Sequence, residues 1–314
     1  MASMHDVDIP TYDGLKLKGT LYSVGAKKPL IILTSGFSGT RDHFLPDFAA
    51  RFNAAGYGAL AYDNRCWGDS EGLPRSEVDP MLQTRDYIDV FNYAAAHPDV
   101  DPSKIVYWGS SMSGGNAIGA AVMNSSIAGV IVQVPFVSGE VVTRLPGHPA
   151  EFLTANRHQG SEIRVPVFPS SAEEVLNGSC KAVLKDAGAI PFMEETTKRG
   201  MSYAESCTLQ SLTNIALHEP RAYIHRISPT PFLMVVGDRD ITIPTHLQLE
   251  AFEKALQPKT LKIIRGAGHF EPYYGESFEE NIAAQLEFLK SILYNMYLAA
   301  ILEEKIKKLR ALRE

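Results

Sequence analysis

The chain has 314 residues, of which 45% are apolar and 21% are charged, and its formal net charge is −6. These values are ordinary for a soluble globular protein, and the acidic balance argues against nucleic acid and anionic membranes as partners. No stretch approaches the roughly twenty apolar residues that are needed to span a bilayer.

The N-terminal residues MASMHDVDIP contain neither a basic cluster nor an apolar run, so we expect no signal peptide. The three cysteines, Cys66, Cys180 and Cys207, are odd in number and have no spacing typical of a metal site. We therefore expect neither a disulfide framework nor a bound metal. A reducing, cytoplasmic location fits this pattern best.

The first half of the chain alternates strand-like and helix-like segments. An Asp13-Gly14 pair between two alternating stretches predicts a hairpin turn. Short apolar runs predict buried parallel strands, and amphipathic segments between them predict helices. The strands are expected at residues 29–34, 58–62, 104–108 and 128–134, and the helices at 42–55, 80–96 and 113–123. This order predicts an α/β fold, in which helices cover a mostly parallel sheet.

Residues 138–228 depart from this alternation. Strand-like runs disappear, prolines and polar residues increase, and short helical stretches are expected at 171–186 and 193–200. Two more strands, at 231–236 and 260–265, then flank a helix at 244–256. We therefore predict one core formed by residues 1–137 and 229–293, interrupted by a helical insertion at 138–228.

The chain ends in a long helix-like segment at residues 278–314. Apolar residues recur at a 4-3-4-3 spacing from Ile282 to Met296, which is typical of a helix. One helix of this length would extend roughly 50 Å at about 1.5 Å per residue, more than one domain can bury. Packing on its own domain can account for this helix up to about Leu293. Residues 294–314 are then a C-terminal extension, native or fused by engineering, for which the hypothesis is a contribution to a homo-oligomer. Its mixed charge argues against membrane binding.

A Gly/Ser-rich turn follows the strand at 104–108 and precedes a helix. It reads Gly-Ser-Ser-Met-Ser-Gly-Gly from residue 109, close to the G-x-S-x-G turn that exposes a nucleophilic serine at a helix N-terminus. Ser110, Ser111 and Ser113 all lie in it, and Ser113 takes the place of the final glycine. Ser111 takes the central position of the motif, with Gly109 two residues before it and the small Ser113 two residues after it, so we predict Ser111 as the nucleophile. The alternative is a small-residue turn without chemistry.

A serine nucleophile needs a base and a carboxylate that orients the base, in the chain order serine, acid, histidine in this type of fold. The strand at 231–236 leads to Asp238 and Asp240, and the strand at 260–265 leads to His269 on a glycine-rich loop. A strand-end aspartate often caps a helix, and a lone histidine is often structural. Their joint order predicts a triad of Ser111, Asp240 and His269, with Asp238 in a structural role.

The tetrahedral intermediate of acyl transfer requires two N–H donors for its oxyanion. Met112, directly after the nucleophile, should supply one backbone N–H. The glycine-containing loop after the strand at 29–34 should supply the other from Phe37.

Four segments carry a resemblance to a known family: SGFSGTRD, YDNRCWGDSEG, WGSSMSGG, and VVGDRDITIP with GAGHF. They resemble the α/β-hydrolase superfamily, and residues 4–293 are most similar to its fungal polyketide transferase (hydrolase) family. The resemblance implies the α/β-hydrolase fold, catalysis without cofactor or metal, and a cap formed by the insertion over the nucleophile. It makes four aromatic residues of the insertion candidates for the acyl pocket: Phe152, Phe168, Phe192 and Tyr203.

Together these features predict hydrolysis of a small-molecule ester, lactone or thioester through an acyl-Ser111 intermediate. His269 would act as base and then as acid, and Asp240 would hold its tautomer. An acyltransferase would use the same triad, and the sequence does not distinguish the two. A ligand-binding protein that has lost turnover is the third hypothesis, against which the complete triad argues.

Overall fold

The computed structural model describes residues 3–143 and 149–311, with side chains at residues 3–141 and 150–294. Its main feature is an eight-stranded sheet in the order β1-β2-β4-β3-β5-β6-β9-β10. The strands, in chain order, are β1 (Ser3–Pro10), β2 (Lys16–Ser23), β3 (Lys28–Thr34), β4 (Gly58–Tyr62), β5 (Val100–Ser110), β6 (Gly129–Gln133), β9 (Phe232–Gly237) and β10 (Lys259–Ile264). Only β2 runs against its neighbours among these eight, so the predicted hairpin and mostly parallel sheet are confirmed.

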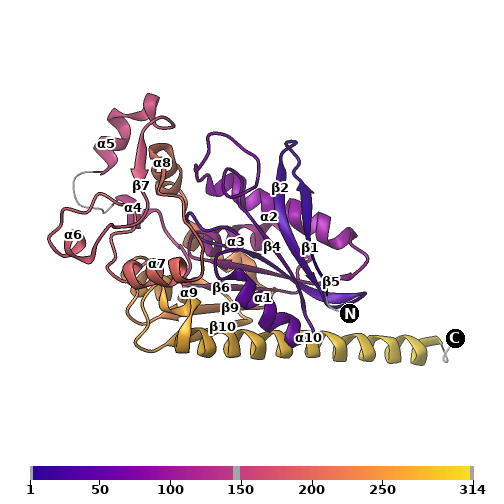
Figure 1. Cartoon of the computed structure of the whole chain (residues 1–314). Helices are drawn as coiled ribbons and strands as arrows, with labels where there is room; N and C mark the ends of the chain where they lie inside the picture. The colour runs from indigo at the N-terminus through magenta and orange to yellow at the C-terminus, as the bar shows by residue number, and fades with distance from the viewer. Residues whose placement is uncertain (1–2, 144–148, 312–314) are drawn as a thin grey trace.

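Helices cover both faces of the sheet because side chains alternate along each strand. Leu30 and Ile32 face a cluster that holds α2 (Pro80–Ala96), α3 (Met112–Met123) and α9 (Thr245–Lys254). Ile31 and Leu33 face the opposite cluster, with α1 (Leu45–Ala54) and the first part of α10 (Gly275–Ala311). Figure 1 shows this layered arrangement. Because helices bury both faces of the central strands, the side chains on both faces are apolar, and the sequence of each of these strands is a continuous apolar run.

Local sequence sets the limits of these elements. The hairpin turn contains Gly14 at φ 87°, a backbone conformation that glycine adopts readily. Helix α2 begins at Pro80, and the preceding Asp79 side chain accepts hydrogen bonds from the N–H groups of Met81 and Leu82.

Within residues 138–228, no described residue adds a strand to the large sheet. They form α4 (Glu140–Thr143), α5 (Pro149–Ala155), α6 (Ala172–Leu176), α7 (Ala189–Lys198), α8 (Leu209–Ala216), a short antiparallel pair of β7 (Arg164–Pro166) and β8 (Ser206–Thr208), and the 3-10 turns η1 (Arg157–Gln159), η2 (Pro220–Ala222) and η3 (Ile224–Ile227). Figure 1 shows helices α4 to α8 gathered at one end of the molecule, away from the C-terminal end of α10.

Two local expectations for this segment are wrong. The helix expected at 171–186 spans only Ala172–Leu176, because Gly178 at φ 76° turns the chain out of the helix. The pair of β7 and β8 was not expected, because strands of three residues are too short to show an alternating pattern.

Helix α10 is fixed to the sheet by buried polar contacts as well as by apolar packing. Gln285 Oε1 accepts from Trp108 Nε1 at 2.8 Å, and Asn281 Nδ2 donates to Gln133 Oε1 at 2.7 Å. Figure 1 shows the C-terminal part of α10 running beyond the rest of the chain. The predicted oligomer contact of residues 294–314 rests on side chains that, apart from that of Tyr294, lie outside the described ones. In the described part of the chain, no helix is both long and apolar enough to cross a membrane.

Candidate active site

Ser111 lies on a strained turn between β5 and α3. Its φ of 52° and ψ of −121° are uncommon for a residue with a side chain and are typical of functional positions. The turn is clamped by backbone hydrogen bonds: Ser111 N–H donates to the Gln133 carbonyl at 3.0 Å, and the Ser111 carbonyl accepts from Phe136 N–H at 2.8 Å. At residue 109 only glycine fits, because a Cβ there would collide with the Ser113 carbonyl. The turn thus holds the Ser111 hydroxyl at a helix N-terminus.

The three serines of this turn point to different partners. Ser111 Oγ lies 2.9 Å from His269 Nε2. The hydroxyl of Ser110 contacts the phenol of Tyr273, and that of Ser113 donates to the carbonyl of Ser35. Among the three, Ser111 alone meets a base.

His269 and Asp240 complete a continuous hydrogen-bonded relay. His269 Nδ1 lies 2.8 Å from Asp240 Oδ2, and both side chains are buried. When Nδ1–H donates to the carboxylate, Nε2 has a free lone pair that can accept the Ser111 proton. The structure therefore brings the three predicted triad residues together from loops that follow β5, β9 and β10.

Two further donors hold the Asp240 carboxylate in place. Its Oδ1 accepts from Ile243 N–H at 2.9 Å, and its Oδ2 accepts from Gln248 Nε2 at 2.9 Å. The neighbouring Asp238 faces elsewhere, because its Oδ1 accepts from Gly266 N–H at 2.7 Å. The structure thus gives the two aspartates different surroundings, and only Asp240 contacts the histidine.

The loop of residues 35–40, here called the oxyanion loop, lies directly over the nucleophile. A Cβ on Gly36 would be 2.7 Å from Ser111 Cβ, so only glycine allows this close approach. Phe37 and Met112 line the same cavity as Ser111. Their backbone N–H groups make no hydrogen bond to any residue that the structure describes. Both donors are therefore free to bind an oxyanion that forms at Ser111.

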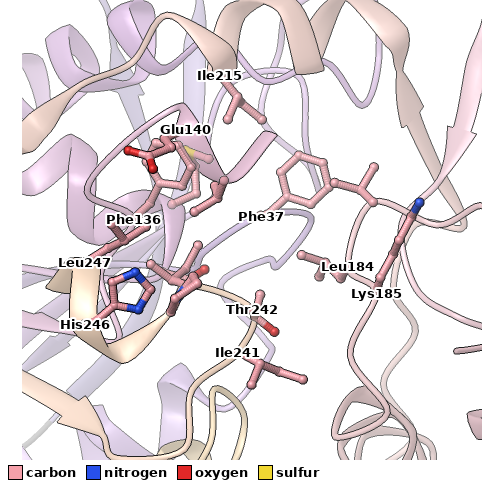
Figure 2. A pocket seen from close by; sticks show the side chains of 16 residues that line it. Phe37, Phe136, Glu140, Leu184, Lys185, Ile215, Ile241, Thr242, His246 and Leu247 are labelled. Atoms are coloured by element: carbon pink, nitrogen blue, oxygen red, sulfur yellow. The ribbon is translucent and has the colours of Figure 1, made fainter. Parts of the chain in front are cut away.

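A cavity of about 240 Å³, here called the larger cavity, opens beside Ser111. Its walls are mostly aliphatic, with contributions from the core and from the 138–228 segment (Figure 2). The aliphatic wall residues are Val141, Val183, Leu184, Ile215, Ile241, Ile243 and Leu247. Figure 2 shows Lys185 and His246 on opposite sides of the cavity. Such walls suit an apolar acyl chain that carries few polar groups.

A second cavity, of about 30 Å³ and here called the smaller cavity, lies on the His269 side of Ser111. Its walls are largely aromatic: Phe168, Phe192, Tyr203, Phe270 and Tyr273. Of the four aromatic residues expected to line the acyl pocket, Phe168, Phe192 and Tyr203 line this smaller cavity, and none of the four lines the larger one. Phe152 lines neither cavity and is 50% exposed. Burial raises the pKa of Tyr273 to about 12, so its phenol is neutral at physiological pH.

His43 joins the oxyanion loop to the 138–228 segment. Its Nδ1 accepts from Thr40 N–H at 2.9 Å, and its Nε2 donates to the Ser202 carbonyl at 2.9 Å. Its ring stacks on Tyr203 with centroids 3.8 Å apart. Burial lowers the pKa of His43, which favours the neutral ring that this bonding pattern requires.

Sequence reasoning missed several residues that build this site. Gln248 lies on the buried face of α9, where only its distance of eight residues from Asp240 could have suggested a contact. His43 and Leu184 carry no motif. Their contacts depend on how the 138–228 segment meets the core, and no local pattern encodes that arrangement.

Comparison with known proteins places this geometry in a family. The model of the alpha/beta hydrolase family matches residues 31–284. The chain is 29% identical to the thiohydrolase aneE of Aspergillus aculeatus over 92% of this chain and 93% of the relative. It is 30% identical to the polyketide transferase grgF of Penicillium sp. over 91% of this chain and 95% of the relative.

A solved structure agrees with these sequence matches. The crystal structure of the α/β hydrolase GrgF from Penicillium sp. sh18 superposes with a TM-score of 0.77 at 27% identity, covering 92% of this chain and 98% of that one. The resemblance found in the sequence is thereby confirmed. The chain belongs to the alpha/beta hydrolase family, in the branch that holds fungal thiohydrolases and polyketide transferases, and is an enzyme of the serine-hydrolase type.

Proposed function

We propose that this enzyme hydrolyses a small-molecule acyl thioester, or a related ester or lactone, through an acyl-Ser111 intermediate. The observation that carries the proposal is the relay from Ser111 through His269 to Asp240, built on the strained turn. The relatives named thiohydrolases support a thioester as the substrate class.

In the first half of the reaction, Ser111 Oγ attacks the acyl carbonyl while His269 Nε2 takes the hydroxyl proton. Negative charge then develops on the carbonyl oxygen, and the N–H groups of Phe37 and Met112 are available to stabilise it. The Asp240 carboxylate stabilises the imidazolium that forms next to it. His269 then gives the proton to the leaving thiolate or alkoxide, and the acyl group remains on Ser111.

In the second half, an acceptor must approach His269 Nε2 to lose its proton. We assign the acyl chain to the larger cavity, because that cavity is aliphatic and contains both proposed oxyanion donors. The space beside His269 is then the smaller cavity of about 30 Å³. A space of this size holds about one or two water molecules, which favours water as the acceptor.

Transfer to an alcohol or amine is the second candidate, because several relatives are named polyketide transferases. It would require a larger acceptor to enter beside His269, against the aromatic wall. Product analysis separates the two reactions: turnover in the presence of added short alcohols should yield mainly the free acid. Predominant formation of the new ester would favour transfer.

The 138–228 segment acts in this proposal as a cap over the nucleophile. Val183 and Leu184 reach the larger cavity, and Phe192 and Tyr203 line the smaller one. Substrate choice would therefore reside largely in this segment. We also propose a cytoplasmic, reducing location, which the unpaired state of all three cysteines supports.

The test is a pre-steady-state measurement with an activated ester. The wild-type enzyme should release one equivalent of the leaving group in a burst, followed by slower turnover. Ser111→Ala should lose the burst and at least about 10⁴-fold of turnover. Ser110→Ala, a change at the adjacent serine, should keep the burst. Turnover that survives in Ser111→Ala would refute the proposed nucleophile.

A further inference from the structure

Ser113 occupies the position where the G-x-S-x-G turn ordinarily has glycine, and its hydroxyl has a defined partner. The side chain is fully buried and donates to the carbonyl oxygen of Ser35, the first residue of the oxyanion loop. Asn64 reinforces this contact, because its Nδ2 lies 3.1 Å from Ser113 Oγ and 3.2 Å from the Ser35 carbonyl. Two donors, one on helix α3 and one in the loop after β4, thus converge on one carbonyl.

That carbonyl belongs to the peptide that enters the oxyanion loop. Fixing it fixes the plane of the peptide between Ser35 and Gly36, one peptide before the N–H of Phe37. The other end of the loop is closed as well, since Ser35 Oγ donates to the Thr40 carbonyl at 2.9 Å. Gly39 N–H also donates to the Gly36 carbonyl at 3.2 Å. The loop therefore has little freedom to rotate the Phe37 N–H away from Ser111.

We propose that Ser113 and Asn64 are positioning residues, which hold the oxyanion loop so that Phe37 N–H meets the developing oxyanion. The inference rests on the acyl-Ser111 mechanism proposed above. Neither Ser113 nor Asn64 lines the larger or the smaller cavity, so they act through Phe37 rather than on the substrate. The hydroxyl at residue 113 thus has a task that the usual glycine could not perform.

The experiment compares Ser113→Ala, Ser113→Gly and Asn64→Leu with the wild-type enzyme. Loss of a whole oxyanion donor costs about 10²–10³ in kcat, so a misplaced donor should cost about tenfold. KM should change less than about twofold, because the donor acts mainly on the transition state. Inhibition by a trifluoromethyl ketone, whose serine adduct carries an oxyanion, should weaken by about the same factor as kcat.

Thr34→Val is the matched control. Thr34 lies directly before the loop, and its buried hydroxyl has no hydrogen-bond partner among the described residues. Removing that hydroxyl should therefore leave kcat and the inhibition constant unchanged. This control shows whether kcat falls because a hydrogen bond to the loop is lost or because any buried hydroxyl near the loop is removed.

A kcat within twofold of the wild type in both Ser113 variants would overturn the inference, and so would a loss of kcat without weaker ketone inhibition. Loss of the folded state in all three variants would also overturn it, because these residues would then serve stability alone. Failure of the proposed function looks different. In that case the wild-type enzyme itself would show neither turnover nor an acyl-enzyme burst.

Discussion

The two regions that meet at Ser111 build their parts of the site in different ways. The core supplies Ser111, Asp240 and His269 from loops at strand ends, each held by hydrogen bonds of the backbone or of buried side chains. The 138–228 segment supplies side-chain walls, aliphatic around the larger cavity and aromatic around the smaller one. In the proposed reaction, catalysis depends on the fixed backbone and the buried hydrogen bonds of the core, and substrate choice depends on the side chains that line the two cavities.

This contrast predicts that changes in the core lower kcat, and Asp240→Asn should show the largest effect. The amide cannot stabilise the imidazolium and favours the wrong tautomer of His269, so kcat should fall about 10⁴-fold. Steady-state kinetics with a chromogenic ester would measure it.

Asp238→Asn is the matched control, because Asp238 lies two residues away and can still accept from Gly266 N–H as an amide. It should retain most of the wild-type activity. Equal losses in the two variants would contradict the assignment of Asp240 as the orienting acid.

Changes in the 138–228 segment should instead alter chain-length preference. Leu184 lines both cavities, so Leu184→Trp should fill space that a long acyl chain needs. We expect kcat/KM for an eight-carbon ester to fall about tenfold relative to the acetyl ester, since pocket contacts of this kind contribute about 1–3 kcal/mol.

Leu176→Trp provides the comparison for this prediction, because Leu176 lies in the same segment but is 83% exposed. Its ratio of activities toward the two esters should match that of the wild type. An unchanged ratio of the two activities in Leu184→Trp would contradict the proposal that the acyl chain binds in the larger cavity.

The smallest expected effect concerns stability near the junction of the two regions. His218 is buried against Phe136, and burial lowers its pKa from 6.5 to about 4. Between these pH values the unfolded chain binds a proton that the folded chain does not, so the free energy of unfolding falls as the pH falls from 6.5 to 4.

Denaturant unfolding as a function of pH would measure this loss, expected to be on the order of 2 kcal/mol. In His218→Gln the decline over this range should be shallower, because glutamine does not titrate. His225→Gln, a change at an exposed histidine, should leave the decline unchanged. Parallel curves for the wild type and His218→Gln would show that His218 does not contribute.

Sequence and structure agree best where local pattern and tertiary fold coincide. The central strands and the order of Ser111, Asp240 and His269 could be predicted, because buried parallel strands and strand-end loops have strong local signatures. The turn contains three serines, of which the motif position selects Ser111. In the structure His269 contacts Ser111, whereas Ser110 contacts Tyr273 and Ser113 contacts Ser35.

The 138–228 segment was predicted less well for a physical reason. Its strands have three residues each and its helix α6 has five, too few for a periodic signal. Its limits depend instead on tertiary contacts, such as Arg199 lying 4.7 Å above the ring of Phe44. Contacts of this kind join residues that are distant in the sequence, and no short window contains them.

The most direct test of the central claim is covalent labelling with a fluorophosphonate, followed by mass spectrometry of the digested protein. The reagent reacts with a serine only where a base activates the hydroxyl. We predict one adduct per chain, on Ser111, and none in the His269→Ala variant. An adduct on Ser110 or Ser113, or an active enzyme that takes up no label, would contradict the account.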